Sequence, residues 1–191
     1  MAIDKKTVKQ VTLTGLTEIL FDRYAGDNTT QLPPEQKLYL LPGNIVALPA
    51  LNILSFLSAV NTESAPKLLF DLRKYKPIAS AMLASTIITP SAIPFLRDDK
   101  PIVFGEFDAD GLDQLSGIRI VRHVARLEKG IPNPKVRPML GLPWALKFEI
   151  ALLPHPGLSL EIVEKLFVEG GVRLGMGTFR KAFGKFAFAW S

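Results

Sequence analysis

The sequence predicts an α+β protein, an antiparallel sheet with two helices on one face, and three segments carry that prediction. Residues 144–153 (WALKFEIALL) alternate apolar and other side chains with the period of two that is typical of a half-buried strand. Residues 159–170 (SLEIVEKLFVEG) have the apolar spacing of an amphipathic helix, with a serine at the start and a glycine at the end. Residues 185–191 (KFAFAWS) predict a final strand with three aromatic side chains on one face.

The remaining elements follow from weaker patterns. Strands are predicted at 8–15, 37–41 and 118–127, and helices from Asn44 or Pro49 to Val60 and over 65–83, where Pro77 would end or kink the second helix. Residues 85–95 (STIITPSAIPF) are β-branched but contain two prolines, which suits an edge strand or an extended arm and excludes a central strand. Residues 96–117 are predicted to form a loop or a short hairpin.

The order of these elements predicts a particular fold. With a middle region at about 61–117 treated as an insertion, the chain runs strand, helix, strand, strand, helix, strand. This is the order of a ferredoxin-like (RRM-like) fold, an antiparallel sheet with two helices on one face. A chain of 191 residues suits one domain, residues 1–191. Residues 21–37 are crowded with turn-forming residues and are predicted to form a long loop or arm.

Composition excludes several classes of protein. The chain has no cysteine, which excludes disulfide scaffolds, thiol catalysis and thiolate zinc sites, and its two histidines are far apart. The sequence contains no uninterrupted run of about 18 apolar residues, the length that would predict a membrane span. The amino-terminal residues do not follow the pattern of a secretory signal. We therefore expect a cytoplasmic protein without a membrane partner. A net charge of +5 makes polyanions plausible partners.

No catalytic residue is predicted. Residues 98–113 contain five aspartates, and carboxylate oxygens suit Mg²⁺ and acid-base chemistry, but their spacing matches no calcium loop or two-metal site. A solvated acidic loop is the preferred interpretation, and metal binding by this segment stays open. Neither His123 nor His155 has a serine or an acid at a motif spacing. We therefore expect a protein that is not an enzyme and needs no cofactor.

Glycines, cations and aromatic residues are concentrated after the last helix, within GGVRLGMGTFRKAFGK. Two interpretations stay open: the glycines form a clamp whose amides hold phosphate groups, or they form a tight turn that leads to the last strand. Flat side chains at Phe179 and Phe183 could stack on bases. The candidate residues in this segment are Gly171, Arg173, Gly175, Gly177, Phe179, Arg180, Lys181, Gly184 and Lys185.

A second basic cluster lies in residues 119–137. In a strand, Arg122 and Arg126 would lie on one face and Arg119 on the other, so Arg122 and Arg126 are added to the candidate nucleic-acid-binding residues. A solvated strand face explains the same pattern equally well. If this cluster lies beside the glycine-rich segment, the two would form one groove.

The end of the chain, a helix followed by GG, LGMG and FGKF and then a strand, resembles the end of the RAMP superfamily, the repeat-associated mysterious proteins that include CRISPR backbone and processing subunits. VTLTGLTEILFDR at 11–23 resembles the first strand of those proteins and the loop after it, and comparable endings occur in uncharacterised phage-encoded proteins. The resemblance implies a ferredoxin-like fold and RNA near the glycine-rich loop. It points to Gly171, Gly175, Gly177 and Gly184, with Arg180 and Lys185 beside them. The chain lacks the family's catalytic histidine near its start, so no RNA cleavage is implied.

Two functional hypotheses follow. The first is a non-enzymatic subunit that binds single-stranded nucleic acid, RNA in preference to DNA, within an oligomeric nucleoprotein complex of several copies or other subunits. Its arginines and lysines would contact phosphates, and Phe179 or Phe183 would stack on a base. The alternative is a self-assembling structural protein, such as one derived from a phage, that forms rings or filaments without nucleic acid. In that case the arm would join copies through exposed Phe21, Tyr24 and Leu32.

Overall fold

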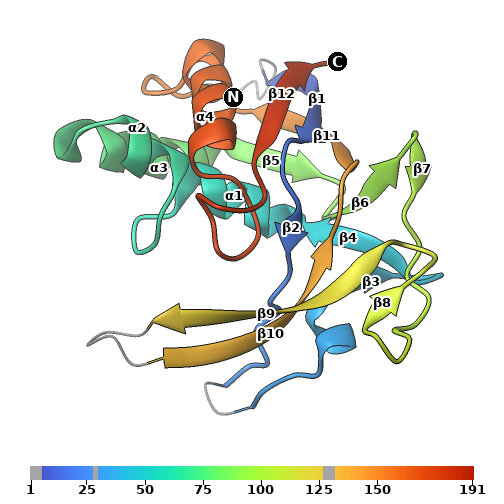
Figure 1. The fold of residues 1–191 in the computed structure, drawn as a ribbon. Helices are drawn as coiled ribbons and strands as arrows, with labels where there is room; N and C mark the ends of the chain where they lie inside the picture. Colours follow the sequence, from blue (N-terminus) through green and yellow to red (C-terminus); the bar gives the residue numbers. More distant parts are fainter. Residues whose placement is uncertain (1–5, 28–29, 127–131) are drawn as a thin grey trace.

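The computed structural model describes residues 6–27, 30–126 and 132–191 of the chain (Figure 1). The described helices are α1 (Ala50–Ser58), α2 (Ala65–Leu69), α3 (Leu72–Ser85), α4 (Leu160–Arg173) and the short 3-10 helix η1 (Pro34–Lys37). The described strands are β1 (Thr7–Gly15), β2 (Ile19–Leu20), β3 (Tyr39–Leu41), β4 (Ile45–Pro49), β5 (Thr86–Thr89), β6 (Ala92–Arg97), β7 (Lys100–Pro101), β8 (Leu112–Asp113), β9 (Ile118–Arg126), β10 (Pro132–Leu140), β11 (Ala145–Leu152) and β12 (Phe186–Trp190). The predicted α+β class is confirmed.

The larger sheet is antiparallel and is centred on β1 and β11. Its strands follow the order β12-β1-β11-β6-β4-β3, while β5 pairs with β11 and β7 pairs with β6. Val11 of β1 lies opposite Phe148 of β11 and opposite Trp190 of β12. Because opposite residues in an antiparallel pair point to the same side, this register gathers the apolar side chains of three strands on one face.

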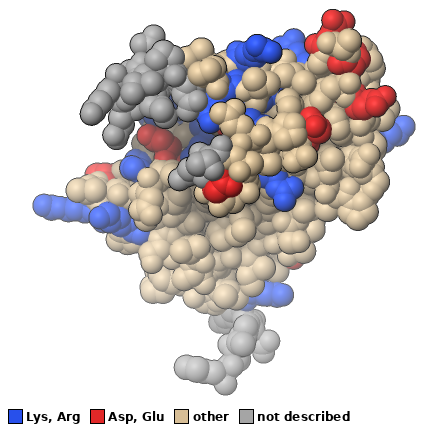
Figure 2. All heavy atoms as spheres, turned by 90° about the horizontal axis from the view of Figure 1, so that it is seen from below, with Lys and Arg blue, Asp and Glu red and all other residues tan. Residues whose placement is uncertain are grey.

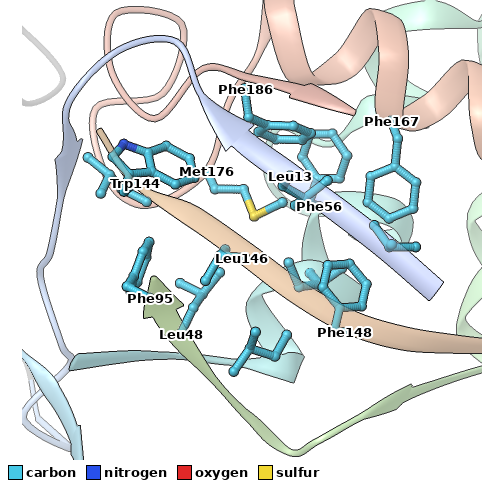
Figure 3. Packing of buried hydrophobic residues seen from close by; sticks show 14 of the residues in the cluster. Leu13, Leu48, Phe56, Phe95, Trp144, Leu146, Phe148, Phe167, Met176 and Phe186 are labelled. Atoms are coloured by element: carbon cyan, nitrogen blue, oxygen red, sulfur yellow. The ribbon is translucent and has the colours of Figure 1, made fainter. Parts of the chain in front are cut away.

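The helices cover that apolar face and complete the core (Figure 3). Phe167 of α4 stacks on Phe188 of β12 with ring centroids 5.0 Å apart, and Phe56 of α1 lies 5.5 Å from Phe186. The alanines between the aromatic residues of β12 are exposed. The predicted aromatic face of the last strand is therefore confirmed, and burial of large aromatic side chains is the main stabilising term of this region.

A second sheet, β2-β10-β9-β8, carries a long hairpin of β9 and β10 that projects from the body of the molecule (Figure 1). The strand predicted at 118–127 forms, but it pairs with β10 in this sheet and does not join β11. The place beside β11 is taken by β5, which lies within the region treated as an insertion. Strand β10 was not predicted, because three prolines between residues 132 and 140 obscure its alternation.

The two proline-based expectations have different outcomes: the exclusion of a central strand was wrong, and Pro77 does not end its helix. β6 lies between β11 and β4 even though it contains Pro94, because it pairs with β4 through residues 92–94 and with β11 through residues 95–96. Each neighbour thus uses a different half of the strand. Pro77 lies inside α3, and the break in the predicted helix comes earlier, where the Asp71 carboxylate accepts hydrogen bonds from two N–H groups and begins a new helix.

Two helix boundaries also differ from the predictions. Residues 45–49 form β4, and α1 begins only at Ala50, since a short buried apolar run has no periodicity that separates strand from helix. Asn44 is accordingly not a helix cap. The last helix continues through Gly170, where it was expected to end, to Arg173.

Candidate nucleic-acid interface

The glycine-rich segment, residues 174–185 between α4 and β12, folds back on itself and on the start of the chain. Four backbone hydrogen bonds fix it, each from the first residue's N–H to the second residue's carbonyl: Lys181 to Leu174 (2.6 Å), Met176 to Gly184 (2.9 Å), Thr178 to Leu20 (3.1 Å) and Gly184 to Glu18 (2.7 Å). The segment is therefore a closed loop held against β2.

The candidate glycines are needed for internal packing. An added Cβ at Gly171 would lie 2.6 Å from the Phe186 ring. Helix α4 and strand β12 approach so closely here that only a glycine fits inside the helix. Gly175 and Gly177 have φ of +76° and +78°, and an added Cβ would meet protein backbone oxygens at 2.7 and 2.6 Å. Gly184 is equally enclosed by the backbone of Met176. These contacts support the turn interpretation, and a role of the glycine amides towards a ligand stays a prediction.

The glycine-rich segment packs against the β9–β10 hairpin, and we call this contact surface the seam. The His123 ring of β9 lies 5.5 Å from the Phe179 ring and 5.3 Å from the Phe183 ring, centroid to centroid. The Arg137 guanidinium of β10 lies over Phe179 at 4.8 Å from the ring centroid. Two segments that are far apart in the sequence therefore form one surface.

A buried charge cluster lies behind the seam. One Asp22 carboxylate pairs with Arg137 at 2.7 Å and with Lys37 at 3.4 Å, and the side chains of both cations are less than a tenth exposed. The Lys37 ammonium also donates to the Val136 carbonyl at 2.6 Å. Within the described part of the chain, Arg137 Nη1 and His123 Nδ1 are buried without a hydrogen-bond partner. The seam thus contains more buried positive charge than its single carboxylate balances.

The cluster ties the predicted arm to the hairpin of the same chain. Phe21 at the start of the arm is 3% exposed and its N–H donates to the Pro138 carbonyl at 3.0 Å, so the expectation of an exposed Phe21 was wrong. Leu32 is partly buried, and Tyr24 is 64% exposed. Of the three apolar residues expected at the surface of the arm, only Tyr24 is strongly exposed.

The hairpin register separates the second basic cluster into two faces. Lys135 lies opposite His123 and therefore shares its face, which borders the seam. Arg122 lies opposite Val136, on the other face, so the predicted groove between Arg122 and the glycine-rich segment does not form. Arg126 is the last residue of β9, and its side chain lies outside the described residues.

Several predicted cations near the glycine-rich segment have partners away from the hairpin. Arg173 pairs with Glu169 one helical turn earlier, at 3.7 Å. Lys181 pairs with Glu63 at 3.4 Å, and Arg180 donates to the Glu63 carbonyl at 2.7 Å. Burial lowers the pKa of Arg180, and the charge of Glu63 opposes this shift. Lys185 takes part in no ion pair among the residues that the structure describes.

Charge is unevenly distributed over the surface. Figure 2 shows many Lys and Arg side chains at the top and left of the view and most acidic side chains at the upper right. In the acidic segment, Asp113 is buried and accepts hydrogen bonds from the Gly105 N–H at 3.0 Å and from Ser116, while Asp108 holds its own turn. Among the described residues no three or more acidic or histidine side chains form a group that could hold a metal ion.

From the sequence, His123 was considered only as a catalytic group, Arg137 was counted in the second basic cluster without being chosen as a site residue, and Asp22 was given no role. No local signal would have found them, because Asp22 and Arg137 are 115 residues apart and their contact depends on a strand that was not predicted. A scan against protein-family models and a search of the curated proteins returned no match for this chain. None of the helices in the described ranges has the length and apolar character needed to cross a bilayer. The seam is therefore the feature of the described residues that bears most directly on function.

Proposed function

We propose that this protein binds single-stranded nucleic acid along the seam, with RNA preferred over DNA, as a non-catalytic subunit of a nucleoprotein complex. The observation that carries the proposal is the meeting of the glycine-rich segment with the hairpin face that bears His123, Lys135 and Arg137. Positive charge and flat aromatic side chains on one surface are the two features that single-strand binding combines. A RAMP-like, ferredoxin-like fold is part of the proposal, because the order β12-β1-β11-β5 with helices on one face is the arrangement that such a fold would have.

The strand would run beside the hairpin and contact cations that are unpaired or only weakly paired with a carboxylate. Lys135 borders the seam, and Lys185 follows its last glycine; neither takes part in an ion pair among the described residues. Arg119 pairs only at 3.8 Å with Glu18, and both side chains are well exposed, so it can exchange this partner for a phosphate. Phe179 and Phe183 are half-buried against His123 and leave ring surface on which a base can stack.

Fluorescence anisotropy titrations with mixed-sequence RNA and DNA strands test the proposal. The double variant Lys135→Ala/Lys185→Ala should bind roughly 25-fold more weakly at 0.1 M salt, and its plot of log affinity against log salt should be shallower by about 1.4, because each lost phosphate contact removes about 0.7 from the slope for a single strand. RNA should bind more tightly than DNA of the same sequence.

The matched control is Arg73→Ala/Lys76→Ala, which removes two exposed cations from α3, outside the seam. It should change the affinity and the slope little. Absence of binding at low salt, or equal losses in the two double variants, would reject the seam as the binding surface. Homogeneous large assemblies without nucleic acid, seen by light scattering together with absent binding, would instead support the structural alternative.

A further inference from the structure

A cavity of about 310 Å³ opens beside the seam, between the glycine-rich segment, α1 and the start of the arm. Its polar lining includes Asp22, Tyr24, Tyr39, Asn52, Ser55 and Arg180. Leu48 and Phe56, both buried in the core, also line it. The cavity thus has an apolar and aromatic part together with a few polar groups, which is the usual composition of a small-ligand site.

The lining offers both a flat surface and hydrogen-bonding groups. Tyr24 is strongly exposed, and Tyr39 is half-buried with the Arg23 guanidinium 5.6 Å from its ring centroid. On α1, the Asn52 amide supplies donors and an acceptor and the Ser55 hydroxyl supplies one of each. A planar heterocycle with a hydrogen-bonding edge fits this set of groups better than an aliphatic ligand.

The charge around the cavity favours a ligand that carries an anionic group. The Asp22 carboxylate is already paired with two cations, Arg137 and Lys37. Arg180 is half-buried at the cavity and donates to a backbone carbonyl, so its guanidinium keeps further donors for an acceptor oxygen. The cavity therefore combines space for a neutral ring with excess positive charge beside it.

We propose that this cavity receives one unpaired base of the strand that binds at the seam, an inference that rests on the proposed function. The base would lie against the tyrosines and present its edge to Asn52 and Ser55, and its phosphate would lie near Arg180. Backbone contacts alone give affinity that does not depend on the bases. An inserted base adds a contribution from stacking, and the hydrogen bonds of its edge make that contribution depend on which base is present.

The test uses a sugar-phosphate strand of roughly twelve units, within the range that compact single-strand sites cover. One version lacks all bases, and the other carries a single base at its centre. The wild-type protein should bind the second version about tenfold more tightly, the gain expected from stacking one base. The strand can slide to place its base, so the result does not depend on knowing the register.

Ser55→Tyr should abolish that gain, because the larger side chain fills the cavity from an exposed position of α1. The matched control Ser80→Tyr makes the same change at an exposed position of α3 outside the cavity and should keep the gain. Asn52→Leu leaves the cavity open and should retain a gain from stacking but reduce the differences among strands that carry each of the four bases.

The outcomes separate the two proposals. If the base-free and single-base strands bind equally to the wild type, or if Ser55→Tyr keeps the full gain while its melting curve shows a folded protein, the base cavity is rejected and backbone binding at the seam stands. If neither strand binds, the proposed function itself fails. The single base could also raise the affinity by stacking on Phe179 alone. In that case Phe179→Ala would lose the gain and Ser55→Tyr would keep it, and this result also overturns the cavity assignment.

Discussion

The helix-covered sheet and the seam are held together by different forces. In the sheet, Phe56, Phe167 and Phe186 are almost completely buried and contact one another through apolar surface. At the seam, the hairpin is held by one carboxylate shared between two cations and by two phenylalanine rings that contact His123 and Arg137. Apolar burial stabilises the first region strongly. In buried ion pairs, the attraction between the charges is largely offset by the free energy needed to remove them from water, so their net contribution to stability is small.

This difference favours opening of the outer part of the hairpin without unfolding of the sheet, while the base of the hairpin stays in the core through Ile118 and Leu140 and pairs with β2. Local opening requires only the loss of the contacts that hold a region, and its free energy can be far below that of global unfolding. Matched substitutions in the two regions test this separation directly.

Phe186→Ala should destabilise the whole protein by about 3–5 kcal/mol, the usual cost of removing a buried phenylalanine from a core. Phe186 is fully buried between Phe56 and Gly171, so no neighbouring side chain can collapse into the space without moving a helix. Urea denaturation followed by circular dichroism measures this loss. The slope of the transition should stay unchanged, which shows that the altered quantity is stability.

Phe179→Ala is the matched change at the seam. Phe179 is only half-buried, and its loss should lower global stability by about 1 kcal/mol, because surface that is already partly in water contributes less on burial. Hydrogen exchange should become faster in the hairpin amides and stay the same in β1 and β11. Equal global losses in the two variants would contradict the separation of the regions.

Asp22→Asn should have an intermediate effect of about 2 kcal/mol, concentrated on the hairpin. The change leaves Arg137 and Lys37 buried without their carboxylate, and the penalty is moderated because the Asp22 side chain is 26% exposed. Hydrogen exchange resolved by residue checks where the loss falls. The expected result is faster exchange in β9 and β10, with the protection of β11 unchanged.

The double variant Asp22→Asn/Arg137→Met sharpens this prediction. It removes one of the two charges that Asp22 balances and leaves Lys37 in place, so it should recover part of the lost stability, since an apolar side chain of similar length needs no counter-ion. If the double variant is less stable than the sum of its single changes, the cluster is not the source of the penalty.

The same contrast explains what could be predicted from the sequence. β1, β11, α4 and β12 were predicted because each has a complete periodic pattern within a few residues, and such patterns follow from burial of one face. The hairpin was half predicted: the imperfect alternation of β9 was enough to predict a strand, while the prolines of β10 hide its partner. Strand order was the least predictable feature, because β5 and β9 both have strand character and only long-range pairing decides which one joins β11.

For the candidate site, the sequence predicted several of the residues that take part but not their arrangement in space. Phe179, Arg180 and Lys185 belong to the segment that forms the seam or the neighbouring cavity, whereas Arg122 points to the other face of the hairpin. The residues that tie the seam together, Asp22 and Arg137, have no local pattern that marks them. Pairing between distant single charges depends on the folded backbone, and sequence spacing carries no information about it.

The smallest expected effect is the difference in stability between Gly177→Ala and Gly43→Ala, a matched control because both glycines have a φ of +78°. Alanine at this φ costs about 1 kcal/mol at either site. At Gly43 nothing lies within 4 Å of the added Cβ, whereas at Gly177 the Cβ would lie 2.6 Å from the Leu20 carbonyl oxygen and displace the segment. Thermal melts should therefore show a larger loss for Gly177→Ala, and the difference between the variants measures the packing of the segment against β2. Equal losses would mean that the glycine-rich segment moves freely at no cost, which would contradict the contact on which the seam depends.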